Sequence, residues 1–184
     1  MARDLTKEKV VQTAADLVNA AGDFNQITLK QVADACGVKV PSLYNHVKGL
    51  DGLHQSLRLH SIRLLERYIR DGLMGLSGRE ALVSAANSYR QFAHDQPGIY
   101  HLGISAVGMD AETKQASQDV TGLLVLAFGS YGLTGEDAYH VLRGYRSVVH
   151  GFVSIELVAG FGLPYDPDVS FKLLVETFLN GVES

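Results

Sequence analysis

The stretch Thr28–Leu50, TLKQVADACGVKVPSLYNHVKGL, decides the fold, because it carries the signals of two short helices joined by a tight turn. Its first residue and Gln31 have the spacing of a capping box, and Gly37 is a typical helix stop. Pro41 is tolerated in a first helical turn and predicts a second helix that runs over residues 42–47. The stretch therefore predicts a helix-turn-helix, although a helical hairpin at the corner of a bundle shares part of this pattern.

The second predicted helix has two different faces. Leu43 and Val47 lie one turn apart and are expected to point inward. The opposite face has polar side chains that can reach phosphates and base edges in a major groove. Together with the turn and the preceding helix, the predicted DNA-binding residues are Thr28, Lys30, Lys39, Val40, Pro41, Ser42, Tyr44, Asn45, His46 and Lys48.

Several short motifs stand in a fixed order along this stretch: Thr28-Leu29, Val32-Ala33, Cys36-Gly37-Val38, and Leu43-Tyr44 with His46. In this order they resemble the DNA-binding segment of the TetR family of bacterial repressors, most specifically over residues 5–60. The resemblance implies a homodimeric repressor that leaves a palindromic double-stranded DNA operator when a small-molecule effector binds. It does not imply which operator or which effector.

Three positions depart from the family pattern. The family usually has Phe where Val47 stands, Lys or Arg where Leu50 stands, and Ser or Thr where Lys39 stands. A cation at the start of the next helix normally meets a DNA phosphate, and here only Lys48 is close enough to replace it. An alternative function therefore stays open, a helical ligand-binding or interaction protein that does not read DNA specifically.

The charge is unevenly distributed along the chain. Residues 1–50 have six Lys or Arg and five Asp or Glu, a net charge of +1, and residues 51–184 have ten and fifteen, a net charge of −5. The two values add to the overall −4, so DNA binding would depend on a local basic patch. Cys36 is the only cysteine, which excludes an intramolecular disulfide and fits a reducing compartment. With the charged start Met1–Asp4, this predicts a cytoplasmic protein without a secretory signal.

Apolar periodicity predicts an all-α chain of about nine helices, with a three-helix head, a long linking helix and a helical bundle. The predicted division is a DNA-binding domain over residues 1–50, a linker helix over 51–72, and a ligand-binding and dimerisation domain over 73–184. Besides the two motif helices, helices are expected over residues 6–22, 51–71, 79–95, 99–108, 113–130, 136–161 and 168–180. The most apolar run, Ser147–Leu163, contains His150 and Glu156, which favours a buried helix over a membrane span.

The C-terminal part shows a second, narrower resemblance. Its residues are Tyr89, Phe92-Ala93, Pro97, Tyr100, His150-Gly151 and Phe171–Leu174. They are similar to a ligand-binding module of the same family that is named for Trp-His-Gly, although this chain has no Trp. The resemblance implies a ligand pocket and a helical dimer face.

We expect the pocket to be lined by Tyr89, Phe92, Tyr100, Ile104, Leu123, Leu126, Tyr145, Phe152 and Glu156. Glu156 has two interpretations, because a buried unpaired carboxylate is costly. It is either exposed or paired with an arginine such as Arg143 or Arg146, or it anchors a ligand that is cationic or donates hydrogen bonds. The expected dimer interface contains Val141, Val148, Leu157, Phe171, Leu174, Val175 and Phe178.

An enzyme is not indicated. The seven histidines do not form an HExxH motif, and the chain has neither a GxSxG motif nor a phosphate-binding glycine loop that ends in Gly-Lys-Ser/Thr. We therefore predict no catalytic residues, no metal site and no cofactor.

Overall fold

The structure is a computed structural model that describes residues 5–104 and 107–183. Every regular element of this described part is helical, with eight α-helices and three short 3-10 helices, which confirms the all-α prediction. The α-helices are α1 (Lys7–Ala21), α2 (Leu29–Cys36), α3 (Val40–Leu43), α4 (Gly49–Leu73), α5 (Gly78–Asp95), α6 (Ala111–Phe128), α7 (Gly135–Leu157) and α8 (Pro167–Glu183). The 3-10 helices are η1 (Phe24–Gln26), η2 (Tyr100–Gly103) and η3 (Gly129–Tyr131).

The chain forms two compact units that interleave along the sequence. Unit 1 contains Met1–Leu64 and Gln96–Ser117, and unit 2 contains Leu65–Asp95 and Gln118–Ser184. The contacts thus divide the chain within α4, between α5 and η2, and within α6. The sequence had suggested a domain over residues 1–50, a linker helix over 51–72 and a second domain over 73–184.

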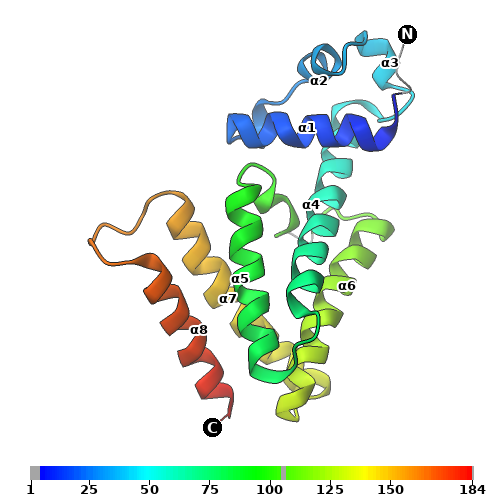
Figure 1. Cartoon of the computed structure of the whole chain (residues 1–184). Helices are drawn as coiled ribbons and strands as arrows, with labels where there is room; N and C mark the ends of the chain where they lie inside the picture. The colour runs from blue at the N-terminus through cyan, green and yellow to red at the C-terminus, as the bar shows by residue number, and fades with distance from the viewer. Residues whose placement is uncertain (1–4, 105–106, 184) are drawn as a thin grey trace. The chain divides into compact units, whose positions relative to one another are not determined.

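In unit 1, α1, α2 and α3 form the three-helix head (Figure 1). Local signals set its helix ends: the Thr6 hydroxyl accepts a hydrogen bond from the Lys9 N–H, and Gly22 ends α1 in the left-handed conformation. The three helices enclose an apolar core because each turns its apolar stripe inward. This core includes Val10, Ala14, Val18, Val32, Leu43, Val47, Leu53 and Leu57.

A segment distant in sequence completes unit 1. The Asn19 amide of α1 donates to Gln96 Oε1 at 2.7 Å, and its oxygen accepts from the backbone N–H groups of Gly98 at 3.0 Å and Ile99 at 3.3 Å. The Ser61 hydroxyl of α4 donates to the Ile99 carbonyl at 2.8 Å. The residues that follow α5 are therefore tied to the head and to the first half of α4.

In unit 2, α5, α7 and α8 pack side by side (Figure 1). Aromatic side chains fill their core, among them Phe92, Phe128, Tyr145 and Phe171, each at most 3% exposed. The Tyr145 hydroxyl donates to the Leu82 carbonyl, and burial raises the pKa of Tyr145 well above its usual value. None of the described helices is both long enough and apolar enough for a bilayer crossing.

Some helix boundaries differ from the predictions. The helix expected over residues 99–108 is a four-residue 3-10 helix, and its positions 105–106 lie outside the described residues, as does the start Met1–Asp4. The second motif helix begins at Val40, before Pro41, because proline is tolerated at either of the first two positions. Helix α7 ends at Leu157 and not at residue 161, because Ala159 adopts a positive φ of 54°.

Candidate DNA-binding site

Helices α2 and α3 form the helix-turn-helix that the sequence predicted. Helix α2 starts with the expected capping box: Gln31 N–H donates to the Thr28 hydroxyl at 3.2 Å, and Thr28 N–H donates to Gln31 Oε1 at 2.8 Å. Gly37 ends the helix in the left-handed conformation, at φ 69°. The recognition segment, which we define as residues 39–48, follows this turn.

The recognition segment continues as helical turns beyond the end of α3. The N–H groups of His46 and Val47 both donate to the Leu43 carbonyl at 2.9 Å, so the last residues of the segment form one more hydrogen-bonded turn. Leu43 is fully buried and Val47 is 4% exposed, as the sequence predicted. These two side chains anchor the segment on the core of the head and orient its polar face.

Most of the predicted DNA-binding side chains lie at the surface. Val40, Ser42 and His46 are half-buried, and the others are exposed: Thr28, Lys30, Lys39, Pro41, Tyr44, Asn45 and Lys48. Tyr44 is 59% exposed, which is high for an aromatic side chain in a packed three-helix head. Its exposure leaves the ring and hydroxyl available for DNA.

The start of α4 lies directly after the recognition segment. The Lys48 carbonyl accepts the hydrogen bond of Gly52 N–H at 3.2 Å, so Lys48 stands at the cap of the helix and Leu50 lies in its first turn. Lys48 is exposed, and Leu50 is 37% exposed. A helix N-terminus attracts anions, and the exposed ammonium of Lys48 adds a full positive charge at this end.

The predicted ligand-pocket residues are divided between the two units. Tyr100 and Ile104 belong to unit 1, and the other seven belong to unit 2. Phe92 and Tyr145 are 1% and 3% exposed and pack in the core, whereas Leu126 is 79% exposed. Tyr89 contacts the His150 ring through a 3.1 Å hydrogen bond between its hydroxyl and Nδ1.

Glu156 is the centre of an ion-pair cluster, and its partner is Arg90 rather than Arg143 or Arg146. Arg90 Nε donates to one carboxylate oxygen at 2.8 Å, Arg90 Nη2 donates to the other, and His94 Nε2 lies 2.9 Å from the first. The hydrogen bonds from Arg90 hold the pKa of Glu156 below its usual value. The same pairing raises the pKa of Arg90, although its partial burial opposes this shift. The carboxylate is thus already paired with Arg90 and in contact with His94 within the protein.

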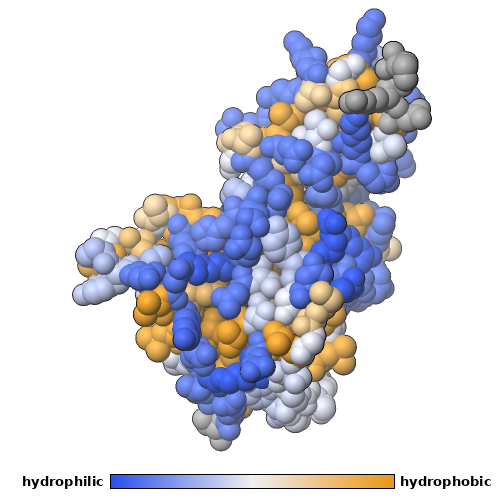
Figure 2. Space-filling view, in the orientation of Figure 1, coloured by the Kyte–Doolittle hydropathy of each residue, from blue (hydrophilic) through white to orange (hydrophobic). Residues whose placement is uncertain are grey.

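The predicted dimer-interface residues separate into two groups. Phe171 and Val175 are 2% and 3% exposed, because α8 packs this side against its own chain, so little of their surface is left for a second copy. Phe171 lies against Phe152 with ring centroids 5.1 Å apart. The other predicted positions are half-buried: Val141, Val148, Leu157, Leu174 and Phe178. Nearby on α8, Val169 and Leu173 are 65% and 66% exposed, and apolar surface is visible over this region in Figure 2.

Sequence reasoning missed two polar side chains with a clear structural role. Arg90 pairs with Glu156 across 66 positions, and Asn19 ties the residues after α5 to the head across up to 80. Arg90 and His94 are one helical turn apart, which is a weak signal for a basic pair facing an acid. Asn19 had no sequence signal, because an asparagine near a helix end usually suggests a cap.

Comparisons with known proteins agree with this architecture. Residues 82–178 match the family model described as a tetracyclin repressor-like C-terminal domain. Over 181 residues the chain is 30% identical to an uncharacterized HTH-type transcriptional regulator of Mycobacterium tuberculosis, in a match that covers 97% of this chain and 82% of that protein. Over 179 residues it is 30% identical to an uncharacterized HTH-type transcriptional regulator of Bacillus subtilis, with 97% and 93% covered.

Among solved structures, the fold is shared with a TetR variant of Acinetobacter baumannii that was crystallised in complex with minocycline. The TM-score is 0.71, the sequence identity is 18%, and the match covers 98% of this chain and 97% of that one.

Proposed function

Since the chain belongs to the TetR family of helix-turn-helix transcriptional regulators, and is thus a DNA-binding regulator rather than an enzyme, we propose that it is a homodimeric repressor which leaves its operator when a small molecule binds. It acts on bacterial DNA in the cytoplasm. The observation that carries the proposal is the recognition segment, whose polar face is exposed while Leu43 and Val47 fix it to the core of the head.

The roles of the DNA-facing side chains follow from their chemistry. Tyr44 and His46 donate hydrogen bonds to phosphates, which positions the head on the duplex without selecting a sequence. Lys39 and Asn45 lie on the same segment, and Asn45 is suited to a bidentate contact with adenine. Lys48 takes the phosphate contact at the start of α4 that Leu50 cannot make.

A second copy is needed because a head this small reads only half of a site. Two heads related by a two-fold axis match a palindrome whose half-sites are about one helical turn, roughly 34–36 Å, apart. The half-buried apolar residues of α7 and α8, including Val148 and Leu174, together with the exposed Leu173, support a helical interface on these two helices.

Ligand release requires that the effector bind one arrangement of the heads better than another. Two connections support such a coupling. Helix α4 continues from the recognition segment in unit 1 into unit 2. Helix α5 of unit 2 ends at Asp95, and the next residues, Gln96–Ile99, are tied to α1 by Asn19. The solved relative from A. baumannii, which was crystallised with minocycline, also supports a small-molecule effector.

The test of DNA reading begins with selection of a binding site from random duplexes, followed by affinity measurements over a range of salt concentrations. The expected result is a palindromic consensus, with an affinity for it at least about a thousandfold above that for random DNA. Equal binding to all sequences, or none, would contradict the repressor. It would favour the alternative of a helical ligand-binding or interaction protein.

The test of assembly uses two exposed apolar positions. Leu173→Glu on α8 is expected to give monomers with weaker operator binding, because a charge at a buried dimer contact is costly. Tyr165→Glu is the matched control, since Tyr165 is 75% exposed in the connection between α7 and α8. Sedimentation that shows an unchanged dimer for Leu173→Glu would contradict the proposed face.

A further inference from the structure

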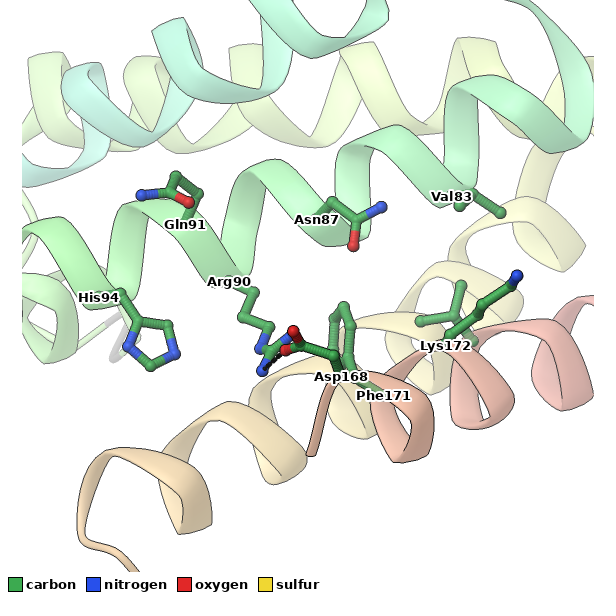
Figure 3. A pocket seen from close by; sticks show the side chains of 9 residues that line it. Val83, Asn87, Arg90, Gln91, His94, Asp168, Phe171 and Lys172 are labelled. Atoms are coloured by element: carbon green, nitrogen blue, oxygen red, sulfur yellow. Dashed lines mark ion pairs between the residues drawn. The ribbon is translucent and has the colours of Figure 1, made fainter. Parts of the chain in front are cut away.

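An open groove lies between α5 and α8 in unit 2 (Figure 3). Its volume of about 710 Å³ falls within the range of small-molecule sites. Arg90 of α5 and Asp168 of α8 point toward one another across it, and none of the nine residues predicted to line a ligand pocket lines this groove. The lining residues are Val83, Asn87, Arg90, Gln91, His94, Asp168, Phe171, Lys172 and Val175.

Most of the charged and polar groups in the groove are satisfied within the protein. Arg90 is held by Glu156 on one side and by Asp168, whose carboxylate lies 2.7 Å from Nη2, on the other. His94 also contacts Glu156, and the Gln91 amide donates to Asp95 at 2.8 Å. These side chains form an internally paired end of the groove rather than free ligand contacts.

Two polar groups remain without a hydrogen bond or ion pair to any described residue, the Lys172 ammonium and the Asn87 amide. Figure 3 shows them on opposite helices, Asn87 on α5 and Lys172 on α8. Both side chains are exposed, so water meets them in the free protein. Both donate hydrogen bonds and Lys172 is a cation, so an anionic acceptor can replace that water, although the whole chain has a net charge of −4.

Apolar side chains form the rest of the lining. Phe171 and Val175 are almost fully buried and present only a small area to the groove, and Val83 on α5 is half-buried. The methylene chain of Lys172 adds to this apolar surface, since a lysine can lay its stem along apolar groups while its charge stays in solvent. A ligand here meets a small apolar surface beside a cationic donor.

We propose that this groove is the effector site and that the effector is an amphipathic organic acid, with its carboxylate on Lys172 and Asn87 and its apolar body against Val83, Phe171 and Val175. This inference rests on the proposed function for its regulatory consequence, but not for binding itself. The bound acid would contact α5. The last residue of this helix, Asp95, directly precedes Gln96, which Asn19 ties to the head. Occupancy of the groove can thereby bias the arrangement of the head.

The experiment titrates the whole chain, without DNA, with octanoate and with its neutral analogue octanamide. Amide NMR shifts report the site, and the expected result is saturable shifts at α5 and α8 with a Kd below about 1 mM for octanoate. Octanamide is expected to bind at least about tenfold more weakly, because a charge-assisted hydrogen bond is lost. Equal binding of both compounds, no binding of octanoate, or shifts confined to other helices would overturn the assignment.

Paired variants separate the groove from general attraction of anions. Lys172→Met keeps the stem and removes the charge, and it is expected to weaken octanoate binding about tenfold or more. Lys114→Met, at an exposed lysine of α6, is the matched control and is expected to change nothing. An equal loss in both variants would overturn the site. Inorganic phosphate is titrated as a further probe. If phosphate binds as tightly as octanoate, the proposed contact between the apolar body of the ligand and the groove is overturned.

The regulatory consequence is measured separately, with the selected operator. Octanoate is expected to lower operator affinity in the wild-type chain and to have less effect in Lys172→Met. A chain that binds octanoate in the groove and keeps its operator affinity would overturn the role of the groove as effector site. A chain that binds no operator at all contradicts the proposed function but leaves the binding result standing.

Discussion

Gly98 is the position at which the structure makes its sharpest stability prediction, because the glycine packs directly on the end of α1. A Cβ at this position would lie 2.3 Å from the Val18 carbonyl oxygen, 2.6 Å from the Val18 carbonyl carbon and 2.8 Å from the Asn19 Cα. All three atoms belong to a helix backbone, which cannot move aside as the end of a side chain can. Non-bonded carbons attract at about 3.5 Å or more, so Gly98→Ala must open this contact by about 1 Å.

The expected cost follows from what that displacement breaks. The three Asn19 hydrogen bonds, now 2.7, 3.0 and 3.3 Å long, would pass beyond hydrogen-bonding distance. Each is worth about 0.5–1.5 kcal/mol, and overpacking adds about 1–3 kcal/mol. The loss of backbone freedom in the unfolded chain offsets about 0.4–1 kcal/mol. We expect Gly98→Ala to lower the free energy of unfolding by about 2–7 kcal/mol.

Thermal unfolding followed by circular dichroism measures this loss, at about 2–4 °C in Tm for each kcal/mol in a chain of this length. Amide hydrogen exchange is expected to show that the loss of protection lies in unit 1. The matched control is Gly122→Ala in α6, where a Cβ would meet nothing within 4 Å. Alanine is the better helix former, so Gly122→Ala is expected to raise the free energy of unfolding by about 0.5–1 kcal/mol. If Gly98→Ala unfolded like the wild type, the close approach of this segment to α1 would be refuted.

Three further predictions concern the head, the ion-pair cluster and one histidine. Tyr44→Ala and His46→Ala should each weaken binding to all DNA sequences by similar factors, and a changed consensus in either variant would contradict their assignment to phosphates. Glu156→Gln should lower the free energy of unfolding, measured by urea titration, by about 2–4 kcal/mol, because Arg90 then keeps only the exposed Asp168 as an ionic partner. Asp168→Asn should leave the free energy of unfolding nearly unchanged in the same titration. Burial lowers the pKa of His54, so between about pH 6.5 and that lowered value the unfolded chain binds more protons than the folded one, and stability falls as the pH falls. His54→Gln should flatten this part of the stability profile, and an identical slope would show that His54 does not cause it.

The sequence by itself determined the features that depend on neighbours three or four residues apart. The capping box at Thr28 and Gln31 and the left-handed glycines at Gly22 and Gly37 are local devices, and all of them appear in the structure where the sequence placed them. The inward positions of Leu43 and Val47 follow from helical periodicity in the same way. Sequence patterns that span only three or four residues are therefore sufficient to predict the helix-turn-helix and to show the family resemblance.

The tertiary structure alone decided which distant groups meet. Periodicity showed that α8 has an apolar stripe, but only packing showed that Phe171 and Val175 face their own chain. The sequence left open whether Glu156 is exposed, paired with an arginine or a ligand anchor, and only the fold showed Arg90 within hydrogen-bonding distance. Gly98 resembled a turn residue in the sequence, and its close contact with Val18 arises from two segments 80 positions apart. Such pairings depend on how helices pack against one another, and no local pattern records that geometry.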